Sequence, residues 1–423
     1  MEILVDAGEA LPRIKDEIAA ATSRVHLAVW HLEPGFEIEP PGLSIKDLLA
    51  QVARSADVRV LMWGGTPLPT PFHPSRRDMR AVCAELAAAG VSCALDSKER
   101  PLHCHHEKII VVDDRVAFVG GLDLTTLGGD RHDDILHIPR GSIGWHDAAA
   151  CLSGPIVNDV SDHFSMRWKE VTGERLAPVP TLEPTSEGVE AQIVRTVPEK
   201  AYSTLPRGDF RILEAYVRAL RSATRLVYLE NQFLWSNEIV SLLADKLRHP
   251  PDESFRLLLV LPSKAMTGTD NTLGQLSLLE EADAGADRLL VCTAYAHDGP
   301  HAQPIYVHAK IGIVDDRWLT IGSANLNEHS LLNDTEVNLI ACDEQLARQT
   351  RQRLWAEHLE TAVENVLADP TELFDAAFRP VAREQADRLT RGMPPTGRIA
   401  KLPGVSRRSK RMLGPIQDLL IDT

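Results

Sequence analysis

Two short segments of this chain combine a histidine, a lysine and an aspartate at the same spacing, H-x-K-x4-D. The residues are His106, Lys108 and Asp113 in the first segment and His308, Lys310 and Asp315 in the second. In both segments a glycine, Gly120 or Gly322, follows the histidine by 14 residues. One such match could arise by chance, but two with the same spacing and the same downstream glycine indicate a functional pair.

The histidine and the lysine of each segment suit chemistry at a phosphate group. The run 106–112 alternates and is rich in isoleucine and valine, so it is predicted to be a strand on which residues two apart share one face. That face would place a nucleophile or an acid beside a fixed positive charge. Because histidine titrates near neutral pH, one imidazole can attack phosphorus while the other, protonated, donates to the leaving oxygen.

The two aspartates of the motifs are candidates of a different kind. Asp113 and Asp315 lie an odd number of residues from the histidine and the lysine, so they should face elsewhere or close the end of the strand. A structural or charge-balancing role fits this position, and Asp-Asp-Arg is also favourable in a hairpin turn. We include both among the catalytic candidates because they complete the motif.

The reaction expected of this pair needs no metal and no other cofactor. The intermediate would be a phosphohistidine, released by water or by an alcohol, with the two lysines stabilising the phosphoryl oxygens. A metal site is the alternative, because the run His103-Cys104-His105-His106 is a dense set of donors. No matching cluster of cysteine and histidine occurs elsewhere in the sequence to complete the coordination, so no metal is expected.

The elements that must hold these residues alternate between helices and strands. The expected helices are 10–23, 45–54 and 75–89, and the expected strands are 24–30, 58–63 and 91–95. After the middle of the chain the same order returns, with helices at 210–222 and 238–248 and strands at 225–230 and 255–261. Alternation of this kind predicts an α/β architecture, and the repeat, about 170 residues long, predicts two related halves.

A proline-containing stretch, 177–190, separates the halves and is predicted to be a linker. The predicted organisation is an N-terminal lobe at 1–176, a C-terminal lobe at 191–365 and a C-terminal extension at 366–423. Within the extension, the stretch 391–415 is rich in proline, glycine and basic residues, among them Arg398, Lys401, Arg407, Arg408, Lys410 and Arg411. The simpler interpretation is a solvated, partly disordered tail, and contact with an anionic membrane surface or a phosphate is the alternative.

Composition narrows the class of protein. The 423 residues are 44% apolar and 25% charged, as in an ordinary globular chain, and no apolar stretch is long enough to span a membrane. The N-terminus has early acidic residues and no secretory signal, so a cytoplasmic location is expected. Six cysteines without a repeated short spacing predict reduced thiols. A net charge of −15 and 5% aromatic residues argue against a nucleic acid as the partner.

The two motifs resemble the paired HKD signature of the phospholipase D superfamily, and the resemblance covers roughly residues 20–365. In the second half, YLENQF (228–233), IGSANLNEHS (321–330) and DTEVNL (334–339) look like blocks of phospholipases D proper. In the first half, FVGGLDLTTLGGDRHDD (118–134) and GWHDAAACLSGPIVNDVSDHFSMRW (144–168) are similar to the first catalytic lobe of the family. The resemblance implies two pseudo-symmetric α/β lobes with mixed sheets flanked by helices, and a site in the cleft between them.

The resemblance also implies a role for each residue of the motifs. His106 would be the nucleophile and His308 the general acid, by analogy with members in which the N-terminal histidine attacks. The reverse order is also open. Lys108 and Lys310 would grip the phosphate.

Further polar residues near the motifs are implied in the same way. Asn325 would add a polar contact to the phosphate, and Asp123 holds the matching place in the first half. Carboxylates 27 or 28 residues after each histidine would orient an imidazole, often that of the opposite lobe. These carboxylates are Glu336 in the second half and Asp133 and Asp134 in the first. His329 departs from the family pattern, because arginine is usual there.

The function that the resemblance implies is a phospholipase D. It would hydrolyse phosphatidylcholine-like glycerophospholipids to phosphatidate and a head-group alcohol, with transfer to other alcohols as a related reaction. The alternatives are a cardiolipin-synthase-like phosphatidyl transferase, a metal-independent nuclease with the same catalytic pair, and a non-catalytic scaffold, which the two intact motifs disfavour. One chain carries both half-sites, so we expect a monomer that meets its phospholipid substrate peripherally at a membrane surface.

Overall fold

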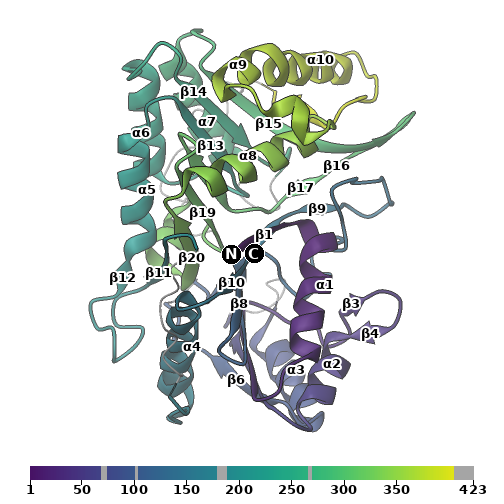
Figure 1. Cartoon of the computed structure of the whole chain (residues 1–423), viewed down its shortest axis with the longest axis vertical. Coiled ribbons are helices and arrows are strands. Elements are labelled where there is room, and N and C mark those ends of the chain that lie inside the picture. The colour runs from purple at the N-terminus through teal and green to yellow at the C-terminus, as the bar shows by residue number, and fades with distance from the viewer. Residues whose placement is uncertain (68–73, 101–102, 179–187, 265–268, 404–423) are drawn as a thin grey trace.

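The computed structural model describes residues 1–67, 74–100, 103–178, 188–264 and 269–403. Within these ranges the chain forms two lobes, each built on a mixed sheet with helices packed against it (Figure 1). The first lobe, purple to blue, occupies the lower part of the view, and the second lobe, teal to yellow, occupies the upper part.

The sheet of the first lobe (2–172) has the strand order β1-β10-β8-β7-β2-β5-β6. Its strands are β1 (Glu2–Val5), β2 (Arg24–Val29), β5 (Asp57–Trp63), β6 (Ser92–Asp96), β7 (Ile109–Val112), β8 (Val116–Gly120) and β10 (Ala148–Ser153). Short strands outside this sheet are β3 (Glu37–Glu39), β4 (Leu43–Ser44) and β9 (Trp145–His146). The helices are α1 (Asp6–Ala19), α2 (Ile45–Val52), α3 (Arg76–Ala88) and α4 (Ile156–Thr172).

The sheet of the second lobe (191–401) contains the order β11-β20-β19-β18-β13-β14-β15, with β12 and β16 at its ends and β21 paired to β15. The strands of this sheet are β11 (Ala191–Val197), β12 (Asp209–Phe210), β13 (Leu226–Glu230), β14 (Arg256–Val260), β15 (Leu289–Asp298), β16 (His301–Pro304), β18 (Ile311–Val314), β19 (Trp318–Gly322), β20 (Glu336–Ala341) and β21 (Ile399–Lys401). The short strand β17 (Tyr306–Val307) lies outside this sheet. The helices are α5 (Arg211–Ser222), α6 (Asn237–Arg248), α7 (Thr269–Asp283), α8 (Glu344–His358), α9 (Pro370–Leu373) and α10 (Arg379–Thr390). Shorter helical turns are η1 (His329–Asn333), η2 (Val363–Val366) and η3 (Phe374–Phe378).

The two sheets agree strand for strand in order and in direction. β2, β5 and β6 pair in parallel, as do β13, β14 and β15. β7, β8 and β10 extend the first sheet in antiparallel pairs, and β18, β19 and β20 extend the second in the same way. This repeat confirms the predicted α/β fold with two pseudo-symmetric lobes.

Two central strands, β7 and β18, join the lobes through a shared core. Both are buried along their whole length. Ile109 and Val111 of β7 pack in one cluster with Ile311 and Ile313 of β18, whereas Ile110 belongs to the core of the first lobe alone. Alternate residues of a strand point to opposite faces. A continuous apolar strand such as β7 can therefore contribute to the shared core on one face and to the core of its own lobe on the other. The motif residues that precede these strands are thereby held at the lobe boundary.

Two of the predicted elements differ from the structure in a way that matters for the site. α1 begins at Asp6, earlier than predicted, because β1 precedes it and pairs with β10. The predicted strand 106–112 is regular only from Ile109, and His106 and Lys108 lie in the segment that leads into it. These residues are therefore placed by contacts with the opposite lobe as well as by their own sheet.

The segment after α8 packs onto the second lobe. β21 pairs with β15, and the buried guanidinium of Arg398 donates to the carbonyls of Ile135 and Leu136 in the first lobe. Arg398 and Lys401, predicted as part of a solvated tail, therefore belong to packed structure. The remaining basic residues of that tail, at 407–411, lie outside the described residues.

All six cysteines are free thiols, and three of them are buried. Among the described residues, no helix combines the length and the apolar composition needed to span a membrane.

Candidate active site

His106 and His308 both lie at the lobe boundary, and the backbone of each is hydrogen-bonded to the opposite lobe. The amide of His106 donates to the carbonyl of Thr335 (2.9 Å), and the amide of His308 donates to the carbonyl of His146 (2.8 Å). β9 and β17 pair in parallel beside the second of these contacts. Short backbone pairings between the lobes thus bring the two motifs together.

A carboxylate from the opposite lobe holds each imidazole. His106 Nδ1 lies 3.0 Å from Glu336 Oε1, and His308 Nδ1 lies 2.6 Å from Asp147 Oδ2. All four side chains are buried. A carboxylate at Nδ1 fixes the tautomer of the ring and leaves Nε2 as the nitrogen available for chemistry.

Lys108 and Lys310 complete two equivalent half-sites. Both are buried, and each ammonium group donates to the carbonyl of the histidine two residues before it, at 2.7 Å for Lys108 and 2.5 Å for Lys310. Burying an ammonium group is unfavourable unless an anion compensates its charge. Two such groups at one boundary are therefore suited to binding an anionic ligand.

The polar residues beside the lysines differ between the two halves. Asn325 Nδ2 donates to Gln232 Oε1 (3.3 Å), which also accepts from Lys310 Nζ (3.4 Å). In the first half, Asp123 Oδ2 lies 3.4 Å from Lys108 Nζ. The matching positions are thus both at the site, but the first half-site carries an additional carboxylate.

The third residue of each motif lies at the far end of its strand from the histidine. Asp113 accepts hydrogen bonds from the backbone amides of residues 22–24, at 2.8 to 2.9 Å, and Asp315 accepts from those of residues 224–226, at 2.7 to 2.8 Å. Burial raises the pKa of Asp113, but these hydrogen bonds lower the pKa by a larger amount. The pKa of Asp113 therefore lies below the ordinary value of an aspartate. The structural role that their spacing predicted fits this position, and a catalytic role does not.

The carboxylates expected to hold His308 are placed elsewhere. Asp133 lies 2.8 Å from His137 Nδ1, and Asp134 is exposed. The expectation rested on a spacing of 28 residues from histidine to carboxylate, which holds for Glu336 in the second half. In the first half that spacing leads to the wrong residue.

Asp147, which the sequence analysis missed, is the first-lobe equivalent of Glu336. Asp147 lies two residues before the β10 partner of Gly120. Glu336 lies two residues before the β20 partner of Gly322. A longer loop at 125–145, which we call the insertion, places Asp147 41 residues after His106. One feature of the sequence could have identified Asp147: it directly precedes the next apolar strand, and Glu336 is the first residue of the corresponding strand in the second half.

The glycine-containing turns after the motifs leave room for groups that approach from the neighbouring strand. A Cβ atom at Gly121 would lie 2.2 Å from Asp147 Oδ1, and one at Gly322 would lie 2.2 Å from Asn338 Oδ1. Any side chain larger than that of glycine would displace these groups. Gly121 is therefore needed for the position of Asp147.

The electrostatic surroundings shift the pKa of His308 and of the two carboxylates at the site. Burial, together with the positive charges of Lys310 and Arg131, lowers the pKa of His308 well below its ordinary value. Burial raises the pKa of Asp147 to about 6, although Lys310 opposes this rise. Burial also raises the pKa of Glu336. At neutral pH, His308 is therefore neutral and Asp147 is ionised.

Arg131 and Trp145 add a cation and an aromatic ring next to His308. The guanidinium carbon of Arg131 lies 3.4 Å from the centroid of the Trp145 ring, and the centroid of that ring lies 4.4 Å from the centroid of the His308 ring. Arg131 is 3% exposed, and its Nη1 makes no hydrogen bond within the described residues. The insertion thus adds a positive charge to the surroundings of His308.

The donor-rich run 103–106 has its side chains directed to different partners. His105 lies 2.8 Å from Thr335, and His103 Nδ1 lies 3.0 Å from Nδ1 of His329, the residue that stands where arginine is usual. His106 is held by Glu336 as described above. The run therefore does not offer its nitrogens to a single centre.

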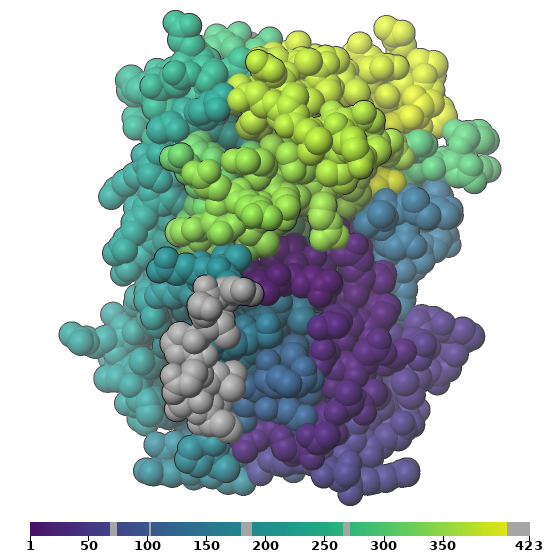
Figure 2. Space-filling view, in the orientation of Figure 1, coloured from purple at the N-terminus to yellow at the C-terminus, as the bar shows by residue number. Residues whose placement is uncertain are grey.

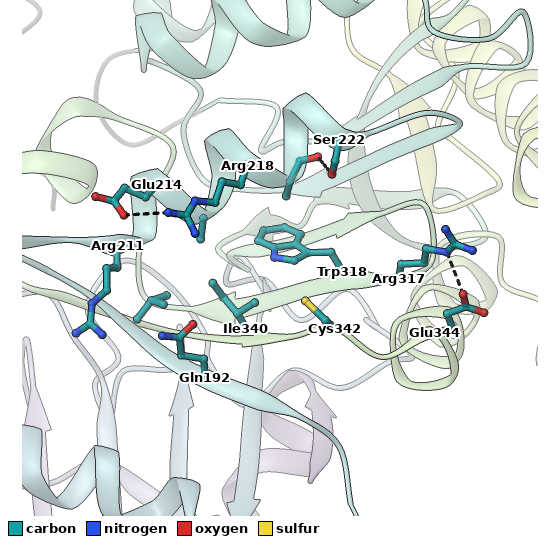
Figure 3. Close-up of a pocket in the computed structure, with 13 residues that line it drawn as sticks. Gln192, Arg211, Glu214, Arg218, Ser222, Arg317, Trp318, Ile340, Cys342 and Glu344 are labelled. Carbon is teal, nitrogen blue, oxygen red and sulfur yellow. Dashed lines mark hydrogen bonds and ion pairs between the residues drawn. The ribbon is translucent and has the colours of Figure 1, made fainter.

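A separate hollow of about 790 Å³ lies on the second lobe, between α5 and the strands β11, β19 and β20 (Figure 3). None of the residues lining it is a histidine or lysine of the motifs. The arginines that line it, Arg211, Arg218 and Arg317, pair with Asp209, Glu214 and Glu344 respectively. Because its cations are already paired, this hollow is less suited to a phosphate than the lobe boundary.

A two-lobed α/β fold with one histidine–lysine pair from each half defines a class of protein built for chemistry at a phosphate. The family described as "Cardiolipin synthase, PLD-like domain" matches residues 14–168 and 217–357. These ranges include both motifs and make up more than half of the chain. The chain therefore belongs to the phospholipase D superfamily.

Two of the curated relatives show the range of activities in this family. The chain is 25% identical to phospholipase D A of Dictyostelium discoideum, over 85% of this chain and 35% of that protein. It is 23% identical to the major cardiolipin synthase ClsA of Bacillus subtilis, over 82% of this chain and 67% of that protein. The chain thus spans about a third of the length of the Dictyostelium protein.

A solved structure is similar in fold. The phosphatidylserine synthase of Haemophilus influenzae matches with a TM-score of 0.58 and 13% identity, over 92% of this chain and 95% of that chain. At this identity the similarity concerns the fold alone.

Proposed function

We propose that this chain is a phospholipase D-type phosphodiesterase that hydrolyses glycerophospholipids, such as phosphatidylcholine, to phosphatidate and a head-group alcohol. The observation that carries the proposal is the meeting of two histidine–lysine pairs at one boundary, with each imidazole held by a carboxylate of the opposite lobe. Neither lobe holds a complete half-site by itself. Both lobes would therefore act on the same phosphate group.

In the proposed reaction, one histidine attacks phosphorus through Nε2, and a P–N bond forms as the bond to the head-group oxygen breaks. The other histidine, protonated, gives its proton to that oxygen. Lys108 and Lys310 balance the charge on the non-bridging oxygens. Water then transfers a proton to the second histidine and attacks phosphorus, which breaks the P–N bond and releases phosphatidate. An alcohol in place of water gives phosphatidyl transfer.

The order of the two histidines can be assigned in two ways. The family resemblance gives the attack to His106. The lowered pKa of His308 favours the opposite order, because the neutral imidazole is the form that attacks. Locating the phosphorus on a trapped intermediate distinguishes the two orders.

The insertion supports a lipid as the substrate. It carries several large apolar side chains that are 41 to 64% exposed, namely Leu127, Ile135, Leu136, Ile138 and Ile143. Figure 2 shows this segment, in blue at the right of the view, on the surface between the lobes. Exposed apolar groups that adjoin an active site are suited to contact with a lipid surface. Two of the named relatives, a phospholipase D and a cardiolipin synthase, point to the same substrate class.

Phosphatidyl transfer of the cardiolipin-synthase type is the second candidate. The description of the matching family and the similarity to ClsA favour it. It would use the same phosphohistidine and differ in the acceptor, which would be a hydroxyl group of a second lipid. A nuclease is less favoured, because a net charge of −15 disfavours binding to a polyanion.

The test offers phosphatidylcholine, phosphatidylglycerol and plasmid DNA separately to the pure chain in the presence of EDTA. We expect release of choline and phosphatidate, abolished in His106→Ala and in His308→Ala. His249→Ala, which changes an exposed histidine at the end of α6, serves as the matched control and should keep full activity. Cardiolipin formed from phosphatidylglycerol, without choline release, would favour the transferase. Cleavage of DNA without lipid turnover would overturn the proposal.

A further inference from the structure

A second cluster of buried histidines and carboxylates lies at the lobe boundary, outside the two histidine–lysine pairs. It combines Asp6 at the start of α1, His137 in the insertion, His146 in β9 and Glu357 in α8. Figure 1 shows the start of α1 and β9 at the boundary between the lobes. His146 directly precedes Asp147, so the cluster is one residue away from the carboxylate that holds the catalytic-site imidazole.

One or more atoms of each side chain point toward a common centre. His137 Nε2 lies 3.0 Å from Asp6 Oδ2 and 3.1 Å from Glu357 Oε1. His146 Nδ1 lies 3.0 Å from Asp6 Oδ1 and 3.2 Å from Glu357 Oε1. Four ligands at about 2.1 Å from a tetrahedral ion are about 3.4 Å apart. The spacing of these atoms is close to that of a coordination shell.

The outer nitrogen of each imidazole is already engaged by another carboxylate. His146 Nε2 lies 2.7 Å from Glu230 Oε2, and His137 Nδ1 lies 2.8 Å from Asp133 Oδ2. A carboxylate can only accept a hydrogen bond, so the outer nitrogen carries the hydrogen. When a metal ion displaces the proton of the inner nitrogen, that nitrogen offers a lone pair toward the common centre. Histidines that bind metals commonly have this arrangement, with the second N–H donated to a carboxylate.

Two of the inner atoms make no hydrogen bond within the described residues, although both are buried. These atoms are Asp6 Oδ2 and His146 Nδ1, on side chains that are 0% and 1% exposed. Asp6 also has a φ of 59°, a left-handed conformation that is unfavourable for aspartate. Both atoms lie 3.0 to 3.2 Å from other members of the cluster, and a cation at their common centre would coordinate both.

We propose that Asp6, His137, His146 and Glu357 bind one divalent transition-metal ion, which their nitrogen and oxygen donors identify as zinc in preference to magnesium or calcium. Two imidazoles and two carboxylates fill a tetrahedral shell and leave no open position, which is typical of a structural site. The ion would join the lobes, because Glu357 belongs to the second lobe and the other ligands to the first.

The ion would also support the active site through the backbone. His137 would anchor the insertion, and His146 would fix β9 next to Asp147. The sequence gives no local signal for this cluster, because its members lie at four separated positions in the chain. The inference is independent of the substrate proposed above.

The test is the metal content of the intact chain, purified without added metal and passed through gel filtration in EDTA, by mass spectrometry of the elements. We expect one zinc per chain, since buried ligands exchange slowly. Glu357→Gln keeps the shape of the side chain but removes one anionic ligand, and it should lose most of the zinc. His329→Gln is the matched control, because it alters a different histidine–carboxylate cluster, formed by His103, His329 and Asp334, and should keep the zinc.

A second measurement does not depend on the folding of any variant. The wild-type chain is produced in zinc-depleted medium supplemented with cobalt, and its visible absorption is recorded. Tetrahedral Co²⁺ bands support the site. A folded wild-type chain without zinc and without these bands would show that the cluster is held by protonated histidines instead, which overturns the proposal. Zinc retained in Glu357→Gln but lost in His329→Gln would overturn it as well.

Discussion

At the scale of single residues, Asp147 sets the tautomer and the orientation of His308. Asp147 is a buried carboxylate whose Oδ2 lies 2.6 Å from His308 Nδ1. We predict that Asp147→Asn lowers kcat/KM by about 10- to 100-fold, by analogy with carboxylates that orient metal-binding histidines. Asp134→Asn is the matched control, since Asp134 is exposed and lies in the place where the spacing alone would put the partner. Equal losses in the two variants would contradict the assignment.

The pH dependence of the reaction follows from the same residue. The pKa of Asp147 is raised to about 6, so the carboxyl group is ionised above this pH and takes up a proton as the pH falls through it. Once protonated, it no longer stabilises His308. We therefore predict that kcat/KM decreases below about pH 6, and that this decrease is lost or displaced in Asp147→Asn. A wild-type profile that stays flat well below this pH would show that Asp147 is not required in its ionised form.

At the scale of the secondary-structure elements, the turn after β8 requires a glycine. A Cβ atom at Gly121 would lie 2.2 Å from Asp147 Oδ1. We predict that Gly121→Ala displaces Asp147 and lowers kcat/KM by up to about 100-fold, the range expected when a catalytic group is misplaced by about 1 Å. Gly35→Ala is the control, because a Cβ atom there would meet nothing within 4 Å. Thermal unfolding of both variants separates a local effect from a loss of fold.

The exposed apolar side chains of the insertion lead to a prediction about membrane contact. Leu136 is 64% exposed there, and Leu367 is 56% exposed in the second lobe. If Leu136 enters a lipid surface, Leu136→Asp forfeits about 2 kcal/mol of apolar burial, or more than tenfold in vesicle binding. Activity on a soluble short-chain phospholipid should be unchanged, and Leu367→Asp should affect neither measurement. Equal vesicle binding by Leu136→Asp and the wild type would exclude this loop as the contact.

The sequence predicted the elements well where local patterns decide them. Alternating apolar runs placed the central strands, and the repeat of the motifs predicted two lobes of the same order. The prediction that the strand begins at His106 was wrong, because the strand begins at Ile109. His106 is held by a hydrogen bond to Thr335 of the other lobe and not by the sheet. The spacing from His106 leads to Asp133 and Asp134, and not to Asp147, for a related reason. The pairing of a histidine with its carboxylate depends on strand register and on the length of the insertion, which a single sequence does not reveal.

The whole molecule explains why each half repeats the same motif. Both lobes present a histidine and a lysine at the boundary, and each supplies the carboxylate that the other histidine needs. The shared apolar core behind β7 and β18 holds these parts at a fixed separation. Long-range clusters such as the one around Asp6 and Glu357 exist only after the lobes have joined. For this reason they had no signal in the sequence.

The central claim is that one phosphate group reacts with the paired histidines. The most direct measurement is to incubate the chain with a phospholipid labelled at phosphorus, stop the reaction rapidly and locate the label by mass spectrometry of peptides under conditions that preserve phosphohistidine. We predict label on the peptide of His106 or of His308, and none when both are replaced by alanine. Lipid turnover with label on neither histidine would contradict the account.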